Sequence, residues 1–233
     1  MTSIKAINSA SHSKVKIMSN PNFIQSKNKH FVPVLVHEFM SASQEFPIVF
    51  VKDVDTGQFN AIALLGLKPK ENLFFDEKSW QASYVPQALT LYPFVIHQED
   101  GKDKALLCFD EDSPLVNEAK GQTLFDKNGT QEKWLAEKGE AVVDYVEKTE
   151  ITKHFIKLLL SKELLAPQTL NLKIEGEEEY TLAGLYVIDE QKLNALSDKD
   201  FTELRKTGAI PAIYASLLSM QRIHQLVRRQ STK

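Results

Sequence analysis

The alternation of hydrophobic and polar residues predicts three β-hairpins. In the first, a run of β-branched and aromatic residues leads through the turn Asp55-Thr56-Gly57 into a second apolar run. In the second, the dipeptide Asp100-Gly101 lies between two strands, which is typical of a tight hairpin turn. The hairpins are expected in residues 47–67, 94–109 and 170–189. The sheet that they form should therefore be largely antiparallel.

Helical spacing of apolar residues predicts a short helix and a long one. The short helix is expected over residues 34–41 behind Pro33, because proline is tolerated in the first turn of a helix. The long helical stretch covers residues 131–165. Its apolar face should carry Leu135, Val142, Val146, Phe155 and Leu159. Because this stretch exceeds the usual length of globular helices, a break is predicted at 148–152, and Pro167 should end the helix.

The C-terminal region is predicted to be helical too. Asp198 is expected to cap a helix that Gly208 stops, and a second helix should cover residues 210–229. The apolar stripe of this second helix consists of Ile213, Leu217, Met220, His224 and Val227. Such a stripe suits a protein core or a homodimer interface equally. The fold class is therefore α+β, with antiparallel β-hairpins packed against helices, a long central helix and a helical C-terminal end.

Charge is distributed unevenly along a chain whose overall composition is ordinary. The 233 residues are 42% hydrophobic and 25% charged, with a net charge of −3. This predicts a globular protein without strong attraction to nucleic acid or anionic lipid. Residues 1–37 nevertheless contain five lysines and no acidic residue. Residues 1–30 are interpreted as a basic N-terminal arm with an edge strand around "KVKIM", and residues 31–233 as a single domain. The arm either binds phosphate or an acidic partner, or is a solvated tail.

Cysteine usage and the N-terminal sequence indicate the compartment. Cys108 is the only cysteine, so it cannot form an intramolecular disulfide. It lies in a predicted strand and is expected to be a buried, unreactive thiol. The first twenty residues lack the apolar core of a signal peptide, and no apolar run approaches the length of a membrane span. The sequence thus predicts a cytoplasmic protein without a membrane span.

Motifs of common catalytic, nucleotide and metal sites are missing. The chain has neither a G-x-S-x-G elbow nor a glycine-rich phosphate loop. Its six histidines are scattered in sequence. His37 and Glu38 are neighbours, but adjacent residues of a helix point about 100° apart and would not bind one ion together. Neither a metal nor a cofactor is predicted, and the sequence leaves open whether the protein is an enzyme.

A set of short motifs resembles a known family. The motifs occur in the order "EFPIVFV", "LLGLKPKENLFFD", "YVPQALTLYPFVI", "LLCFDED" and "GQTLFDKNG". Together with "LAGLYVIDEQKLNALSDKDFTELRKTGAIPAIYASLLSM" they resemble the SapC family of bacterial proteins over residues from about 14 to 224. The family takes its name from a bacterial surface-layer gene cluster, so the resemblance also suggests a role in the cell envelope. The lack of an export signal argues against that role.

Residues in or beside these motifs are the candidates for ligand binding. They are Glu38, Glu45, Phe46, Tyr84, Tyr92 and Asp110. Gly66 and Asn72 suit turns, and Pro93 suits the change from a helix to a strand, so these three are interpreted as architectural.

Tyr84 and Tyr92 allow two interpretations. If a helix over residues 84–92 packs across the first hairpin, the tyrosines form aromatic walls of a groove, with Glu38 and Glu45 as its carboxylates. Alternatively, each tyrosine lies in the core and is anchored by one hydrogen bond.

The leading functional hypothesis is a non-catalytic, cytoplasmic accessory or binding protein. Its partner would be a peptide, a small metabolite or another protein, recognised by the aromatic groove. One alternative is an enzyme of unfamiliar type that uses Glu38, Glu45 or Asp110 as general acid or base. Another is an assembly role in the surface layer or cell envelope.

Overall fold

The computed structural model describes residues 3–76, 79–98, 105–173 and 179–232. The chain divides into two compact units. The smaller unit comprises Met1–Phe23 and Gln87–Glu147, and the larger unit comprises Ile24–Pro86 and Lys148–Lys233. Both combine antiparallel strands with helices, which confirms the α+β class. Over the described ranges, no helix has both the length and the apolar character that crossing a bilayer requires.

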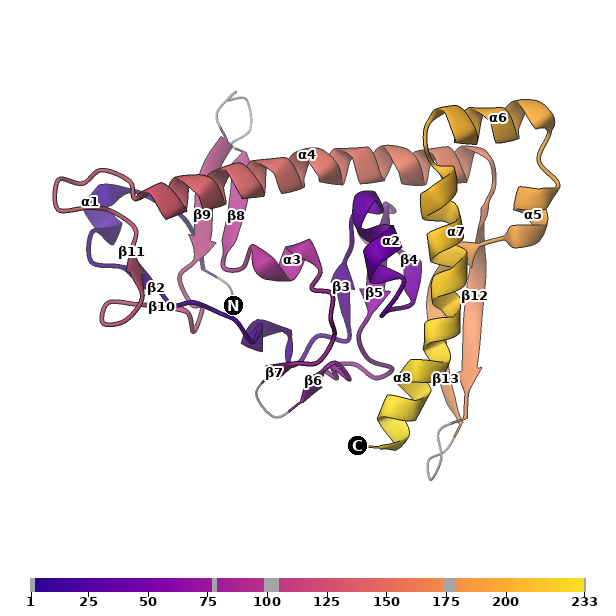
Figure 1. The fold of residues 1–233 in the computed structure, drawn as a ribbon, viewed down its shortest axis with the longest axis horizontal. Helices are drawn as coiled ribbons and strands as arrows, with labels where there is room; N and C mark the ends of the chain where they lie inside the picture. The colour runs from indigo at the N-terminus through magenta and orange to yellow at the C-terminus, as the bar shows by residue number, and fades with distance from the viewer. Residues whose placement is uncertain (1–2, 77–78, 99–104, 174–178, 233) are drawn as a thin grey trace. The chain divides into compact units, whose positions relative to one another are not determined.

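A five-stranded antiparallel sheet is the framework of the larger unit (Figure 1). In spatial order its strands are β12 (Leu165–Leu172), β13 (Tyr180–Ile188), β4 (Ile48–Lys52), β5 (Phe59–Leu64) and β3 (Phe31–Pro33). Strands β4 and β5 are the first predicted hairpin, with Gly57 at a left-handed φ of 69° in its turn. Strands β12 and β13 are the third, although residues 174–178 of its turn lie outside the described part. Both hairpins are confirmed.

A short helical segment packs an aromatic side chain between this sheet and the longest helix. It consists of the 3-10 helix η2 (Val36–Glu38) and α2 (Phe39–Ala42). The ring of Phe39 lies edge-on to Phe155 of α4 (Lys133–Ser161), with centroids 5.8 Å apart, and 6.3 Å from Phe50 of β4. The predicted short helix is therefore present, but Pro33 ends strand β3 and does not lie in the first helical turn.

The C-terminal helices are tied to the same sheet through buried serines. The Ser219 hydroxyl, at the end of α7 (Ile210–Ser219), accepts a hydrogen bond from the Ile48 backbone N–H at 2.8 Å and donates one to the Ser216 carbonyl at 2.6 Å. This joins α7 to the beginning of β4, and in Figure 1 the helix runs beside β13. The other short elements of this unit are η1 (Ile24–Ser26), β6 (Phe75–Asp76), β7 (Ser79–Trp80), α5 (Glu190–Asn194), α6 (Asp198–Lys206), α7 (Ile210–Ser219), η3 (Met220–Arg222) and α8 (Ile223–Ser231).

Helix α4 corrects the prediction of a break at residues 148–152. It is unbroken from Lys133 to Ser161, so the expected break is absent. The Thr152 hydroxyl donates to the Lys148 carbonyl at 2.8 Å and accepts the Val36 N–H at 3.0 Å, which holds the helix at that point. The helix ends where Glu163 adopts a left-handed φ of 53° and Leu164 N–H bonds back to the Leu159 carbonyl.

Three further details of the predicted helices differ from the structure. Pro167, the predicted stop, lies inside strand β12, and Val146 of the predicted apolar face is 42% exposed. The cap of α6 is Ser197 and not Asp198, because its hydroxyl accepts the Asp200 N–H at 3.1 Å.

The predicted C-terminal helix is interrupted by the 3-10 turn η3. Of the predicted stripe, Ile213 is buried, whereas His224 is exposed. The buried face consists of Ala212, Ile213, Ala215, Ser216, Ser219, Ile223 and Leu226. Because the 3-10 turn shifts the helical phase, residues chosen at α-helical spacing from Ile213 leave the buried face.

The smaller unit contains two three-stranded sheets and the first half of α4. One has the order β1-β9-β8 and the other β10-β2-β11. Its elements are β1 (Ile4–Ala6), α1 (Ser9–His12), β2 (Lys16–Ile17), α3 (Gln87–Thr90), β8 (Phe94–Gln98), β9 (Ala105–Asp110), β10 (Val116–Asn117) and β11 (Gln122–Thr123). Strands β8 and β9 confirm the second hairpin, while its Asp100-Gly101 turn lies outside the described residues.

The N-terminal residues form part of this unit's sheets. Ile4 pairs with Asp110 in β9, and Ile17 pairs with β10 on one side and β11 on the other. The strand around Lys16 is thus central in its sheet, where an edge strand was predicted. The boundary between an arm of residues 1–30 and a single domain of residues 31–233 stays a prediction.

Candidate functional site

Residues 36–42 of the larger unit present a closed polar side and an open apolar side. On the polar side, Glu38 is 3% exposed. Its carboxylate accepts the Leu35 backbone N–H at 2.9 Å, as the acid of a capping box does, and the Tyr84 hydroxyl at 2.6 Å. Burial, and then the hydrogen bond to Glu38, raise the pKa of Tyr84 above its ordinary value. The Tyr84 hydroxyl therefore stays protonated and donates a hydrogen bond to the buried Glu38 carboxylate.

A second carboxylate holds the neighbouring loop. Glu45 accepts the Ser83 backbone N–H at 3.1 Å and also the Ser83 hydroxyl. Within the loop, the Trp80 indole N–H donates to the Tyr84 carbonyl at 3.0 Å. Residues 80–84 are thus fastened to the segment that carries Glu38 and Glu45, and both carboxylates serve the chain's own backbone and side chains.

Phe46 lies in an aromatic cluster beside this loop. It is fully buried, with its ring centroid 4.7 Å from that of Phe74 and 5.9 Å from that of Trp80. The Arg229 guanidinium of α8 lies over Phe74 at 4.4 Å from the ring centroid and donates to the Leu73 carbonyl at 3.3 Å. Phe46 therefore contributes to the core in this structure.

Gly66 and Asn72 have the architectural surroundings that their sequence context predicts. A Cβ added at Gly66 would lie 2.2 Å from the Glu71 carbonyl oxygen, so only glycine permits this backbone approach. The Asn72 side chain is buried; it donates to the Ser26 carbonyl and accepts the Phe74 N–H, each at 2.8 Å.

The six sequence-predicted site residues fall into two groups. Glu38, Glu45, Phe46 and Tyr84 belong to the larger unit, where hydrogen bonds and ring contacts connect them to one loop. Tyr92 and Asp110 belong to the smaller unit. Helix α3 covers only Gln87–Thr90 and includes neither Tyr84 nor Tyr92. A groove shared by the two tyrosines stays a prediction.

In the smaller unit, Asp110 is the buried last residue of strand β9. Its Oδ1 accepts the Ser3 and Asp112 backbone N–H groups, each at 3.2 Å. Tyr92 is half-buried against the hydrophobic core of that unit. Cys108 is 3% exposed, and burial raises the pKa of its thiol, which confirms the prediction of a buried cysteine.

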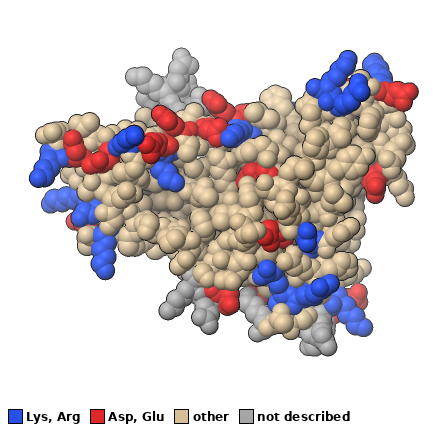
Figure 2. Space-filling model, viewed as in Figure 1, with Lys and Arg blue, Asp and Glu red and all other residues tan. Residues whose placement is uncertain are grey.

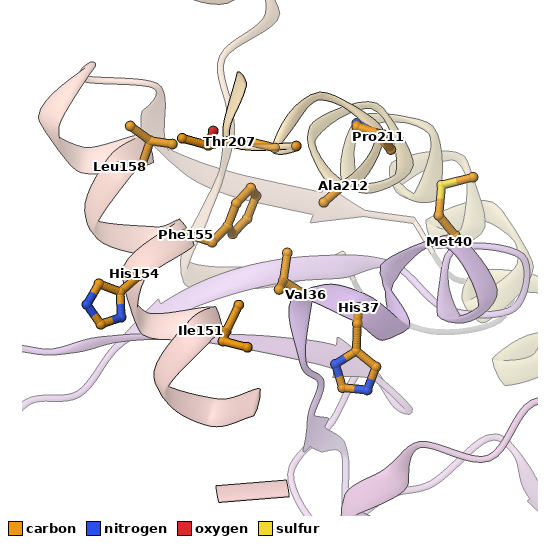
Figure 3. Close-up of a pocket in the computed structure, with 12 residues that line it drawn as sticks. Val36, His37, Met40, Ile151, His154, Phe155, Leu158, Thr207, Pro211 and Ala212 are labelled. Atoms are coloured by element: carbon orange, nitrogen blue, oxygen red, sulfur yellow. The ribbon is translucent and has the colours of Figure 1, made fainter. Parts of the chain in front are cut away.

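The open side of residues 36–42 lines a pocket of about 540 Å³ (Figure 3). Three elements supply its walls: the η2–α2 segment, the C-terminal half of α4, and the start of α7. Apolar side chains dominate the lining, namely Val36, Met40, Ile151, Phe155, Pro211 and Ala212. In Figure 3, Val36, Ile151 and Phe155 point toward the middle of the cavity. On α4 the lining positions recur every three or four residues, so one helical face forms a whole wall.

The mouth of this pocket exposes large apolar side chains. Met40 and Ile151 are each 59% exposed. In Figure 2 the face over α2 and α7 is mostly tan, so few charged side chains cover it, whereas acidic and basic side chains are mixed over the first half of α4. Met40 is an unbranched thioether that adapts its shape to what it contacts. This combination of exposed apolar side chains around a cavity is typical of a binding site.

Two imidazoles lie at the rim of the pocket. His37 and His154 both line it and both are exposed. The Nδ1 of His154 lies 2.7 Å from the Glu150 carbonyl oxygen, which can only accept, so Nδ1 carries the proton. In the neutral ring Nε2 is then an acceptor for a ligand hydroxyl or amide. Among the described residues, no three His, Cys, Asp or Glu side chains gather as metal ligands.

Sequence reasoning missed most of this pocket. The sequence singles out His37 only as the neighbour of Glu38, and it predicts a helix break at the position of Ile151. The available signal was the spacing of Ile151, Phe155 and Leu158, which puts three apolar residues on one helical face. In the structure Ile151 is exposed, Phe155 is buried and Leu158 is partly buried. No sequence pattern predicts that this face of α4 lies opposite Pro211 and Ala212 of α7.

Comparison with known proteins identifies a family and adds no relative of known structure. The family model described as SapC matches residues 7–226. No curated protein and no solved structure matches the chain.

Proposed function

The chain belongs to the SapC family, and we propose that it is a non-catalytic accessory protein that binds a small, largely apolar metabolite in the pocket of its larger unit. The observation that carries the proposal is the cavity itself. Its volume of about 540 Å³ lies within the range of small-molecule sites. Its walls are mainly aliphatic and aromatic, with polar groups confined to few positions, which is the usual make-up of such sites.

The rim defines what polar group the ligand should carry. His154 lies at the rim with its ring turned away from the middle of the cavity in Figure 3, and its Nε2 is an acceptor when the ring is neutral, so it would meet a ligand hydroxyl or amide N–H at the mouth. The apolar body would lie against Phe155 and Val36, where burying apolar surface provides the affinity. A molecule with an apolar body and one hydrogen-bond donor fits these walls.

The surroundings of the motif carboxylates support a non-catalytic role. Glu38 accepts two hydrogen bonds from its own chain, Glu45 is bonded to Ser83, and Asp110 accepts two backbone N–H groups. A general acid or base has to reach the proton of a substrate, so carboxylates committed to structural hydrogen bonds are poor candidates. The proposal also places the protein in the cytoplasm, since a single buried cysteine suits a reducing compartment.

The proposal is tested by native mass spectrometry of the full chain purified gently from its own host. We expect a mass excess in the native spectrum that disappears on denaturation. Ile151→Glu places a carboxylate at the apolar pocket mouth and should remove the excess, because burying an unpaired charge opposes binding. The matched control is Leu218→Glu, since Leu218 is 64% exposed in the same unit but does not line the pocket.

A titration with the neutral apolar probe N-phenyl-1-naphthylamine gives the second readout. We expect saturable fluorescence enhancement with one site, weakened at least about tenfold by Ile151→Glu and unchanged by Leu218→Glu. Equal affinity in the two variants would show that the probe binds elsewhere and would refute the pocket as the binding site.

A further inference from the structure

The smaller unit contains a second pocket with different chemistry. Its volume is about 370 Å³, and all its lining residues belong to that unit. The lining comes from the loop after β2, the end of α3, the start of β8 and the first two turns of α4. Aromatic rings form its walls, namely Phe23, Tyr92, Phe94 and Trp134. Tyr92, a residue of the "YVPQALTLYPFVI" motif, thus lines a cavity within its own unit.

The aromatic walls are held in place by the fold. Phe94 is 4% exposed and lies edge-on to Trp134, with ring centroids 6.1 Å apart. The Trp134 indole N–H donates to the Thr123 carbonyl at 2.9 Å, which fixes the ring against β11. Because these contacts hold the rings in position, a planar molecule that lies against them would need little side-chain reorganisation.

One cation faces this aromatic surface. Among the described residues that line the pocket, Lys138 is the single charged one, and none of them is a carboxylate. Its ammonium group donates to the Thr90 carbonyl at 3.2 Å, which keeps it at the pocket wall. An ammonium has three donors, so this contact leaves two for a ligand. The half-buried position of Lys138 lowers the screening that a fully exposed lysine would experience.

We propose that this second pocket binds a planar aromatic carboxylate, with its ring against Tyr92 and Trp134 and its carboxylate on the Lys138 ammonium. Aromatic faces bind planar rings through offset or edge-on contacts. A carboxylate accepts charge-assisted hydrogen bonds, which are stronger than those of a neutral amide. Because no described acidic residue in the lining neutralises Lys138, the site should bind an aromatic carboxylate more tightly than the neutral amide of the same shape. This site is independent of the pocket in the larger unit.

The test compares two probes of the same shape by fluorine NMR titration, 4-(trifluoromethyl)benzoate and 4-(trifluoromethyl)benzamide. The full chain is used with Ile151→Glu, so that the apolar pocket of the larger unit does not contribute. We expect the benzoate to bind about tenfold more tightly than the benzamide. Lys138→Met should remove this preference, lowering the benzoate affinity about tenfold and leaving the benzamide affinity within about twofold.

Two further variants locate the site. Lys133 belongs to the same helix, but its side chain is 91% exposed and pairs with Glu137 at 3.6 Å, so Lys133→Met is the matched charge control and should change neither affinity. Tyr92→Leu removes an aromatic wall and should weaken both probes by a similar factor. The proposal is overturned if the benzoate does not bind in the millimolar range, if both probes bind equally, or if Lys138→Met and Lys133→Met behave alike.

Discussion

The two sides of residues 36–42 have different surroundings in the larger unit: one is buried and hydrogen-bonded, and the other lines a pocket. On one side Glu38 is buried and receives hydrogen bonds from Leu35 and Tyr84. On the other side Met40 is mostly exposed and lines an apolar cavity. A single short segment therefore combines a contact that stabilises the fold with a surface that is open to a ligand.

This difference shows why a residue in a family motif need not be a binding residue. Buried polar groups are costly unless they are hydrogen-bonded, so the partners of Glu38 are fixed by the requirements of folding. An exposed apolar side chain such as Met40 has no such requirement, and its contribution to the stability of the fold is small. Substitutions on the two sides should accordingly separate stability from binding.

The largest expected effect is at Phe46, in the aromatic cluster beside the loop that Glu45 holds. Phe46→Ala should lower the free energy of unfolding by about 3–5 kcal/mol, because a fully buried phenylalanine leaves a cavity beside Phe74 and Trp80. Urea unfolding followed by circular dichroism measures the change. Phe201→Ala is the control, since Phe201 is 39% exposed and should cost far less. Similar losses in the two variants would contradict the core assignment of Phe46.

The sequence was sufficient to predict the elements that obey a local pattern. Strands β4, β5, β8 and β9 follow from alternation around recognisable turns, and the left-handed Gly208 ends α6 as expected. The end of α4 was not predictable in this way, because the left-handed position is occupied by Glu163, a residue that rarely adopts it.

The two pockets required information that the sequence does not contain. The wall of the first depends on α7 reaching α2 and α4, which are far apart in the chain. Thr152, which accepts a hydrogen bond from Val36, shows the kind of long-range contact that sets this arrangement. The family motifs identified Tyr84 and Glu38 as candidates, but only the structure shows that they bond to each other.

An intermediate effect is expected at the tyrosine that bonds to Glu38. Tyr84→Phe should lower the free energy of unfolding by about 1–3 kcal/mol at neutral pH, because Glu38 loses a donor while staying buried. Chemical denaturation at a series of pH values measures this loss. Tyr214→Phe is the control, since Tyr214 is 41% exposed. Equal losses in the two variants would mean that the bond to Glu38 does not stabilise the fold.

The same pair predicts a pH dependence. The pKa of Tyr84 is raised in the folded protein, so its stabilising contribution is complete below the unfolded pKa of about 10 and declines as the pH rises beyond it. The stability difference between the unsubstituted protein and Tyr84→Phe should therefore shrink at alkaline pH. A difference that stays constant through this range would contradict the raised pKa.

The smallest effect on stability is expected on the open side. Met40→Ala should change the free energy of unfolding by no more than about 0.5 kcal/mol, because the side chain is 59% exposed. It should nevertheless weaken binding of N-phenyl-1-naphthylamine about fivefold, since a ligand in the pocket loses an apolar contact worth about 1 kcal/mol. Urea unfolding and the probe titration are performed on the same sample, with Leu218→Ala as the exposed apolar control. A loss of stability as large as that of Tyr84→Phe would show that Met40 belongs to the core, and the distinction between the two sides of residues 36–42 would then fail.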